Sequence, residues 1–272
     1  MQTAIAVIFL VLISGLILQV AASRGFRARN SALVAKLRET PPTRPAAGLP
    51  QLVQEFAIRA GAEAGSRLRL ATLLQDGEMR ISQGGRFGRF AAWQAISLGA
   101  PGFVWLARQD VGPFPKLRIT DAYVRREGRL EARLIGSIPV ARASGRTLTL
   151  GEAYRYLAEL PWAPDAILGN PDLEWRITAR NIAEVRLATP AGAARVSFRF
   201  DAAGDIVEIS AKDRPARDAS GNEVLRDWRG YFGDYRQIGP RRIPGTAEVG
   251  YVYPEGYEAY FRCKVTEYHL AT

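Results

Sequence analysis

The sequence has very little cysteine and histidine: Cys263 and His269 are the only two such residues among 272. One cysteine cannot form a disulfide within the chain, and one residue of each type is too few for a Cys/His zinc site. A Ser-His-Asp or Cys-His catalytic site would need His269 as its base, close to the C-terminal end of the sequence. Asp201 and Asp205 could bind a metal through carboxylates, but their DAAGD segment is typical of a hairpin turn. We therefore assign no catalytic residue, no metal site and no cofactor.

The chain carries a net charge of +10 at pH 7, which first suggests nucleic-acid binding. Half of this excess, however, lies between Arg24 and Arg44. The rest is spread over segments in which Arg alternates with Glu and Asp, as on a solvated surface. We therefore expect no nucleic-acid partner.

Charged residues are absent from Thr3–Ala22, a run about long enough to cross a bilayer core as a helix. We expect an uncleaved, single-pass anchor in the lipid bilayer. A cleaved signal peptide is the alternative, because Val20-Ala21-Ala22 resembles a cleavage site, but no Lys or Arg precedes the run. The basic residues that follow favour a cytoplasmic side for the rest of the chain, and they would also suit contact with anionic headgroups.

Composition divides the chain into three parts. Residues 1–23 form the predicted transmembrane anchor. Residues 24–48 form a basic juxtamembrane helix and a Pro-rich spacer, which is stiff and extended. Residues 49–272 form an antiparallel β-rich domain, which is long enough to be one folded unit.

One amphipathic helix is predicted in this domain, over residues 149–168. Thr149 and Glu152 have the spacing of a capping box, which would start the helix. The apolar residues that follow recur at i, i+3, i+4 and i+7, so they share one face. Pro161 would end the main helix, and Pro164 would begin a short final turn.

Apolar and polar residues alternate on both sides of this helix, which predicts short strands joined by tight turns such as Asp76-Gly77. The chain shows no regular alternation of strands and helices, so a parallel sheet is not expected. The predicted fold is mainly β (α+β): a single large curved antiparallel sheet or partly open barrel, covered by one central helix, plus the N-terminal transmembrane helix. The helix would lie over the hollow of the sheet, because its apolar face needs a surface to bury against.

Several short motifs, in this order, resemble the DUF6544 (formerly DUF6920) family of bacterial proteins. The motifs are Pro101-Gly102-Phe103-Val104-Trp105, Arg155-Tyr156-Leu157-Ala158-Glu159 with Trp162, Trp175, Asp213-Arg214-Pro215, Tyr235-Arg236 and Arg242-Ile243-Pro244. The resemblance covers about Leu49 to Leu270. It implies no established activity, and a bacterial source would place the anchor in the inner membrane. At the level of fold, the predicted sheet and helix are similar to curved-sheet lipoprotein carriers of the LolA kind.

Aromatic and charged residues of these segments are the candidate ligand-binding side chains. The aromatic residues would line an apolar cavity, and the charged residues would orient the polar end of a ligand. The candidates are Trp105, Tyr154, Arg155, Glu159, Trp162, Trp175, Asp213, Arg214 and Tyr235. The alternatives are that the aromatic residues fill the core, that Arg155 and Glu159 form a surface ion pair, and that the other charges cap loops.

These observations favour a membrane-anchored binding module for an apolar or amphiphilic, lipid-like ligand. A second hypothesis is a carboxylate-dependent enzyme, a hydrolase or isomerase with Glu159 or Asp213 as its general base. A third is a structural partner in a membrane complex that uses an exposed sheet edge.

Overall fold

A computed structural model describes residues 2–109, 117–218 and 220–272. Its strands are β1 (Leu70–Met79), β2 (Gly88–Ser97), β3 (Phe103–Gln109), β4 (Leu117–Val124), β5 (Glu127–Leu134), β6 (Ile138–Ser144), β7 (Glu174–Ala179), β8 (Ile182–Thr189), β9 (Gly192–Phe200), β10 (Ile206–Arg217), β11 (Glu223–Ile238), β12 (Arg241–Tyr253) and β13 (Gly256–Ala271). They form one 13-stranded sheet in the order β6-β5-β4-β3-β2-β1-β13-β12-β11-β10-β9-β8-β7. Neighbours in the sheet are neighbours in sequence, except that β1 pairs antiparallel with β13. The strands therefore form two meanders, β1–β6 before the central helix in sequence and β7–β13 after it. The pairing of the first strand with the last joins the two meanders into one sheet.

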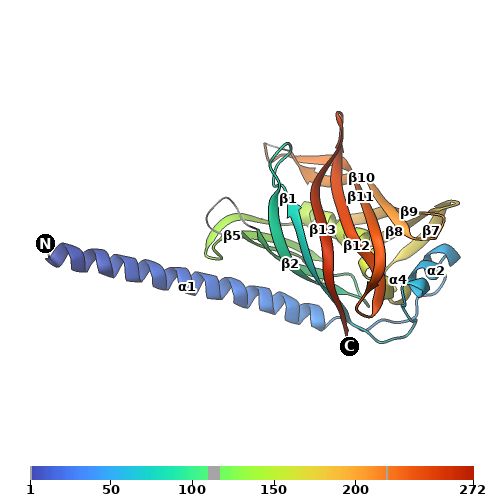
Figure 1. The fold of residues 1–272 in the computed structure, drawn as a ribbon, viewed down its shortest axis with the longest axis horizontal. Helices are drawn as coiled ribbons and strands as arrows, with labels where there is room; N and C mark the ends of the chain where they lie inside the picture. The colour runs from blue at the N-terminus through green and yellow to red at the C-terminus, as the bar shows by residue number, and fades with distance from the viewer. Residues whose placement is uncertain (1, 110–116, 219) are drawn as a thin grey trace.

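The helices are α1 (Gln2–Arg38), α2 (Gln51–Arg59), α3 (Arg146–Ala158), the 3-10 helix η1 (Leu160–Trp162) and α4 (Pro164–Gly169). α3 packs against β4, β5 and β6 at one end of the sheet and against β8, β9 and β10 towards the other end. Both ends can contact one helix only if the sheet bends around it, as Figure 1 illustrates. The prediction of a mainly β fold built on one large antiparallel sheet is confirmed.

The start of α3 differs from the predicted capping box. The helix begins at Arg146, after Gly145 at a φ of 100°, and has no side-chain cap. The Thr149 hydroxyl instead accepts a hydrogen bond of 3.0 Å from the backbone N–H of Gly128. A Cβ at Gly128 would lie 2.8 Å from the backbone of Thr149, so the close approach of the start of β5 to the helix requires glycine. Glu152, the other half of the predicted box, is buried.

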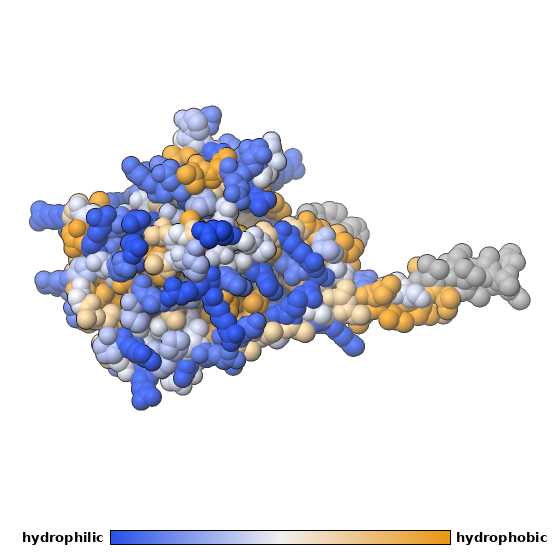
Figure 2. All heavy atoms as spheres, turned by 180° about the vertical axis from the view of Figure 1, so that it is seen from behind, coloured by the Kyte–Doolittle hydropathy of each residue, from blue (hydrophilic) through white to orange (hydrophobic). Residues whose placement is uncertain are grey.

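α1 is one continuous helix, and its first half extends away from the rest of the protein (Figure 1). Exposed apolar side chains cover this arm between Phe9 and Val20, and Figure 2 shows them as an orange surface. No helix among the residues that the structure describes is long and apolar enough to span a membrane. The transmembrane helix predicted at Thr3–Ala22 is therefore not supported, because no described stretch of α1 combines the required length and apolarity.

The second half of α1 packs on the outer face of the sheet, against β2, β3 and β4. Asn30 accepts a hydrogen bond of 2.9 Å from the Thr120 hydroxyl, and Arg133 stacks on Phe26 at 5.3 Å. Leu37 is fully buried in an apolar cluster on this face, with Leu70, Ala95, Val104, Ala122 and Val124. Apolar and polar contacts together hold this half of the helix on the sheet.

The Pro-rich segment after α1 also runs along the folded body. The backbone N–H groups of Thr43 and Arg44 donate hydrogen bonds to the carbonyls of Leu68 and Gly169, at 2.7 and 2.9 Å. Thr43 is buried, and its side chain occupies the space that a Cβ at Gly169 would need. The segment is thus tied to the residues just before β1 and to α4.

The main core lies between the inner face of the sheet and the helices α3 and α4. Tyr156 of α3 is fully buried; it donates a hydrogen bond to the Ser97 carbonyl and accepts one from the Asn170 amide. Most residues of α3 are buried, so the predicted polar face of this helix does not reach solvent. The reason is that the sheet curves around the helix instead of covering one side of it.

Candidate functional site

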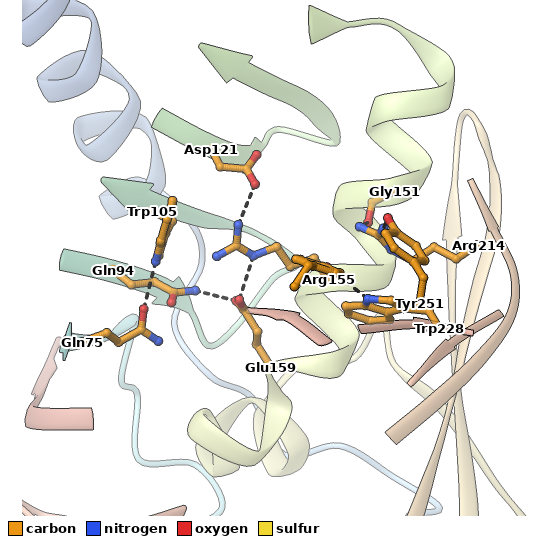
Figure 3. A network of polar contacts seen from close by, with 11 residues as sticks. Gln75, Gln94, Trp105, Asp121, Gly151, Arg155, Glu159, Arg214, Trp228 and Tyr251 are labelled. Atoms are coloured by element: carbon orange, nitrogen blue, oxygen red, sulfur yellow. Dashed lines mark hydrogen bonds and ion pairs between the residues drawn. The ribbon is translucent and has the colours of Figure 1, made fainter. Parts of the chain in front are cut away.

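α3 places a polar cluster inside the curve of the sheet, with Arg155 at its centre (Figure 3). The Arg155 guanidinium donates hydrogen bonds to Asp121 on β4, at 2.6 Å, and to Glu159 one helical turn away, at 2.8 Å. It also stacks on the rings of Phe103 and Trp105, at 4.8 and 5.1 Å. The three charged side chains are only 10–17% exposed. Arg155 and Glu159 therefore do not form the surface ion pair that was the alternative interpretation.

Two glutamines extend this cluster across the inner face of the sheet. Gln94 on β2 donates a hydrogen bond from its amide nitrogen to Glu159. Gln75 on β1 accepts one from the indole N–H of Trp105, at 2.9 Å. Both glutamines are buried, so their polar groups depend on partners inside the protein.

A second arginine, Arg214 on β10, lies next to this cluster (Figure 3). Its guanidinium donates hydrogen bonds to the Tyr251 hydroxyl and to the Gly151 carbonyl of α3, and it stacks on Trp228 at 4.6 Å. The register of β10 shifts just before Arg214, where Asp213 has a φ of 50°. This irregularity turns Arg214 into the interior and leaves Asp213 exposed.

Glu152 of α3 lies close to both arginines, yet its buried Oε2 has no hydrogen-bond partner among the described residues. Burial raises the pKa of Glu152 well above its ordinary value, and the charge of Asp121 adds to this effect. Arg155 and Arg214 oppose the rise in pKa. Burial also raises the pKa of Glu159, against the opposing charge of Arg155. Because Glu152 has no ion pair among the described residues, it is the carboxyl best suited to hold a proton in this cluster.

Five polar atoms of the cluster are buried without a hydrogen-bond partner in the described part of the chain: Gln75 Nε2, Gln94 Oε1, Asp121 Oδ1, Glu152 Oε2 and Arg214 Nε. An unsatisfied buried donor or acceptor costs about 1–3 kcal/mol, so such groups in native proteins usually meet water, an ion or a ligand. The five atoms come from β1, β2, β4, α3 and β10 and include both donors and acceptors. The cluster can therefore bind a polar group of mixed hydrogen-bonding character, and it can supply a proton from Glu152.

The structure brings some of the predicted binding residues together. Trp105, Arg155 and Glu159 belong to the polar cluster, and Arg214 lies next to it. Tyr154 is buried on the same helix.

The other predicted residues lie outside the cluster. Trp162, Trp175 and Tyr235 each pack against a phenylalanine elsewhere in the core, with ring centroids 5.5–6.2 Å apart. Asp213 is exposed. Among the residues that the structure describes, no group of three or more His, Cys, Asp or Glu side chains is placed to hold a metal ion.

Sequence reasoning missed three strand residues of the cluster, Gln75, Gln94 and Asp121. Each occupies a position that the alternating pattern assigns to the inner face: Asp121, for example, lies between the buried Ile119 and Tyr123. The sequence could have indicated these residues, because each is a polar residue at a strand position where the alternation predicts a buried apolar one. Such a residue is costly unless it is paired, and for that reason it marks a candidate site.

No curated protein sequence matches the chain. Three solved structures are similar to the chain at low identity. A proposed outer membrane lipoprotein-sorting protein domain from Vibrio parahaemolyticus is 11% identical, with a TM-score of 0.47 over 82% of this chain and 92% of that one. A LolA superfamily protein from Nitrosomonas europaea is 8% identical, with a TM-score of 0.43 over 83% and 95%. A DUF1329 family protein from Desulfovibrio piger is 9% identical, with a TM-score of 0.45 over 84% and 93%. At these identities and TM-scores the similarities carry no conclusion about this chain.

The sequence model of DUF6544, described as a family of unknown function, matches residues 40–263. The match covers most of the chain and confirms the resemblance seen in the motifs. The protein belongs to the DUF6544 family.

Proposed function

We propose that this protein is a binding module that holds an amphiphilic, lipid-like molecule between α3 and the inner face of the sheet. One observation carries the proposal: five polar atoms of the cluster are buried without a hydrogen-bond partner among the described residues, and aromatic rings stack on its two arginines. A molecule with a polar end and an apolar body suits both parts of this arrangement. Its polar end would lie beside Glu152, Arg155 and Arg214.

The charges of the cluster indicate the kind of polar end that fits. Three carboxyl groups, from Asp121, Glu152 and Glu159, face the two guanidinium groups of Arg155 and Arg214. With a proton on Glu152 the cluster is neutral. A neutral cluster with unpaired donors and acceptors suits an uncharged or zwitterionic polar end better than a strongly charged one.

The apolar body of the ligand would lie against aromatic rings next to the cluster. The rings of Phe90, Trp105 and Phe261 pack together with centroids 5.1–6.3 Å apart, and Tyr251 stacks on Tyr260 at 5.2 Å. Phe90 and Trp105 are buried and the other three rings are partly buried, so a ligand would enter only if these rings repack or if α3 moves away from the sheet. This requirement predicts slow binding and release.

Native mass spectrometry of the full chain tests the proposal, both as purified and after addition of a monoacylglycerol or a lysophosphatidylcholine. We expect a retained molecule, or binding of one of these two probes. Glu152→Gln should keep the fold and change the affinity for the probe. Glu174→Gln, at an exposed residue of an edge strand, should keep the fold and leave the affinity unchanged. Protein that is consistently ligand-free and binds neither probe would argue against the proposal.

Glu152 also supports a second candidate function, a hydrolase or isomerase that uses this carboxyl as a general acid. A raised pKa keeps the proton on Glu152 at pH values where an ordinary glutamate has lost it. The bases predicted from sequence fit this role less well, because Glu159 is engaged by Arg155 and Asp213 is exposed. A screen of ester and enolisable substrates tests this function: Glu152→Gln should abolish any turnover without loss of fold, and wild-type protein inactive on all of them argues against it.

A further inference from the structure

A separate hollow lies on the outer face of the sheet, in the cleft between the second half of α1 and strands β1 to β4. Its volume is about 1060 Å³, which is large enough for a small-molecule site, since such sites measure about 300–1,000 Å³. The polar cluster of Arg155 is on the inner face of the same strands. The two places are therefore separated by the sheet itself.

The floor of the cleft is an apolar row that crosses three strands. Leu74 on β1 pairs in register with Trp93 on β2, and Trp93 pairs with Leu106 on β3. All three residues line the cleft and are only partly buried. Phe26 and Val34 of α1 line the cleft from the helix side. A groove lined in this way suits an unbranched hydrocarbon chain, because apolar side chains of the sheet and of α1 would contact the chain from both sides.

The neighbouring cross-strand row on the same outer face carries two arginines. Arg108 on β3 and Arg118 on β4 are register partners, and both line the cleft two residues along from the apolar row. Their neighbour in the same row is Ala91, whose small side chain leaves room beside Trp93. Four arginines in all line the cleft against two carboxylates: Arg27, Arg38, Arg108 and Arg118, with Asp76 and Glu267. The rim is therefore complementary to a negative charge.

We infer that this cleft binds one single-chain anionic amphiphile, such as a long-chain fatty acid. Its carboxylate lies at Arg108 and Arg118, where guanidinium groups can form charge-assisted hydrogen bonds. Its hydrocarbon chain lies along Leu106, Trp93 and Leu74, under α1. The site goes beyond the proposed function, because it uses the outer face of the sheet and requires a charged headgroup, whereas the inner cluster suits a neutral one.

Tryptophan fluorescence of the full chain distinguishes the two faces, with dibromostearic acid as the probe, because bromine quenches only an indole in contact with it. Trp93 lies on the outer face, and Trp105 is buried on the inner face of the neighbouring strand. We expect dibromostearate to quench the wild-type protein and Trp105→Phe, and to lose most of this quenching in Trp93→Phe. Both substitutions keep an aromatic ring, so the fold should be retained. The uncharged methyl ester should bind about two- to fivefold more weakly, the effect of about 0.5–1 kcal/mol from a partly exposed charge pair.

Quenching that persists in Trp93→Phe but disappears in Trp105→Phe would place the probe inside the sheet. That result would overturn the cleft site and leave the proposed function intact. Absence of quenching in the wild-type protein would also overturn the cleft site, whatever monoacylglycerol binding shows. Equal affinity for the acid and its methyl ester would overturn recognition of the negative charge.

Discussion

Arg155 on α3 and Asp121 on β4 form a 2.6 Å ion pair inside the protein, with side-chain exposures of 17% and 11%. The pair connects the central helix to one end of the sheet, and Glu159 supplies a second carboxylate to the same guanidinium. Transfer of each charge out of water costs several kcal/mol, and the pairing offsets this cost. Loss of one partner would therefore leave an uncompensated charge in the core.

Arg155→Met should lower the free energy of unfolding by about 3–5 kcal/mol, because Asp121 and Glu159 lose their common partner. Arg186→Met is the matched control, since it breaks a more exposed pair with Glu174 and should cost less than about 1 kcal/mol. Urea unfolding of the three proteins measures both changes. Similar losses in the two variants would contradict the structural role of the buried pair.

Glu152→Gln should remove part of the pH dependence of stability. Burial raises the pKa of Glu152 in the folded state above its ordinary value of 4.5. The folded protein therefore keeps this proton where the unfolded chain has lost it, and the resulting stabilisation is complete below about pH 4.5 and is lost as the pH rises towards the folded pKa. As the pH rises above about 4.5, the wild-type protein should therefore lose stability relative to Glu152→Gln. A difference in unfolding free energy between the two proteins that stays constant with pH would refute the assignment.

The overall architecture could be predicted because it follows from local patterns. Alternating apolar residues with tight turns specify antiparallel strands, and the curved sheet follows from the need to bury the helix. The breaks at Pro161 and Pro164 are also confirmed, since α3 ends at Ala158 and α4 begins at Pro164. The strands, the turns and the helix breaks each depend on residues close together in the sequence.

The polar cluster could not be predicted in the same way, because it depends on which strands become neighbours. Gln75, Gln94 and Asp121 come from three strands of one meander, and Arg214 of the other meander lies next to their cluster only because both meanders curve around α3. The amphipathic pattern of α3 also implied one exposed face, whereas the sheet encloses the helix and buries Arg155 with its partners. Neither the enclosure nor the register is a local property of the sequence.

Gly128→Ala should destabilise the protein by about 1–3 kcal/mol, as overpacking commonly does. The added Cβ would lie 2.8 Å from the backbone of Thr149, so the start of β5 and the start of α3 would have to separate. Gly15→Ala is the control, because a Cβ at Gly15 meets nothing within 4 Å. Thermal unfolding of both variants gives the comparison. A Gly128→Ala protein as stable as the Gly15→Ala protein would show that the contact between β5 and the helix is not tight.

Leu37→Ala should weaken the attachment of α1 to the outer face of the sheet. Leu37 is fully buried there, whereas Leu18 on the projecting arm of the same helix is 71% exposed. A buried Leu→Ala change costs about 2–5 kcal/mol, and at this position the cost falls on the docking of the helix. Hydrogen exchange of the α1 amides after Phe26 should therefore be faster in Leu37→Ala than in wild-type protein, and unchanged in Leu18→Ala. Unchanged protection of the α1 amides in Leu37→Ala would mean that Leu37 does not hold the helix in place. The same variant also tests the outer cleft, whose helical wall exists only while α1 is docked. Leu37→Ala should therefore weaken dibromostearate binding as well.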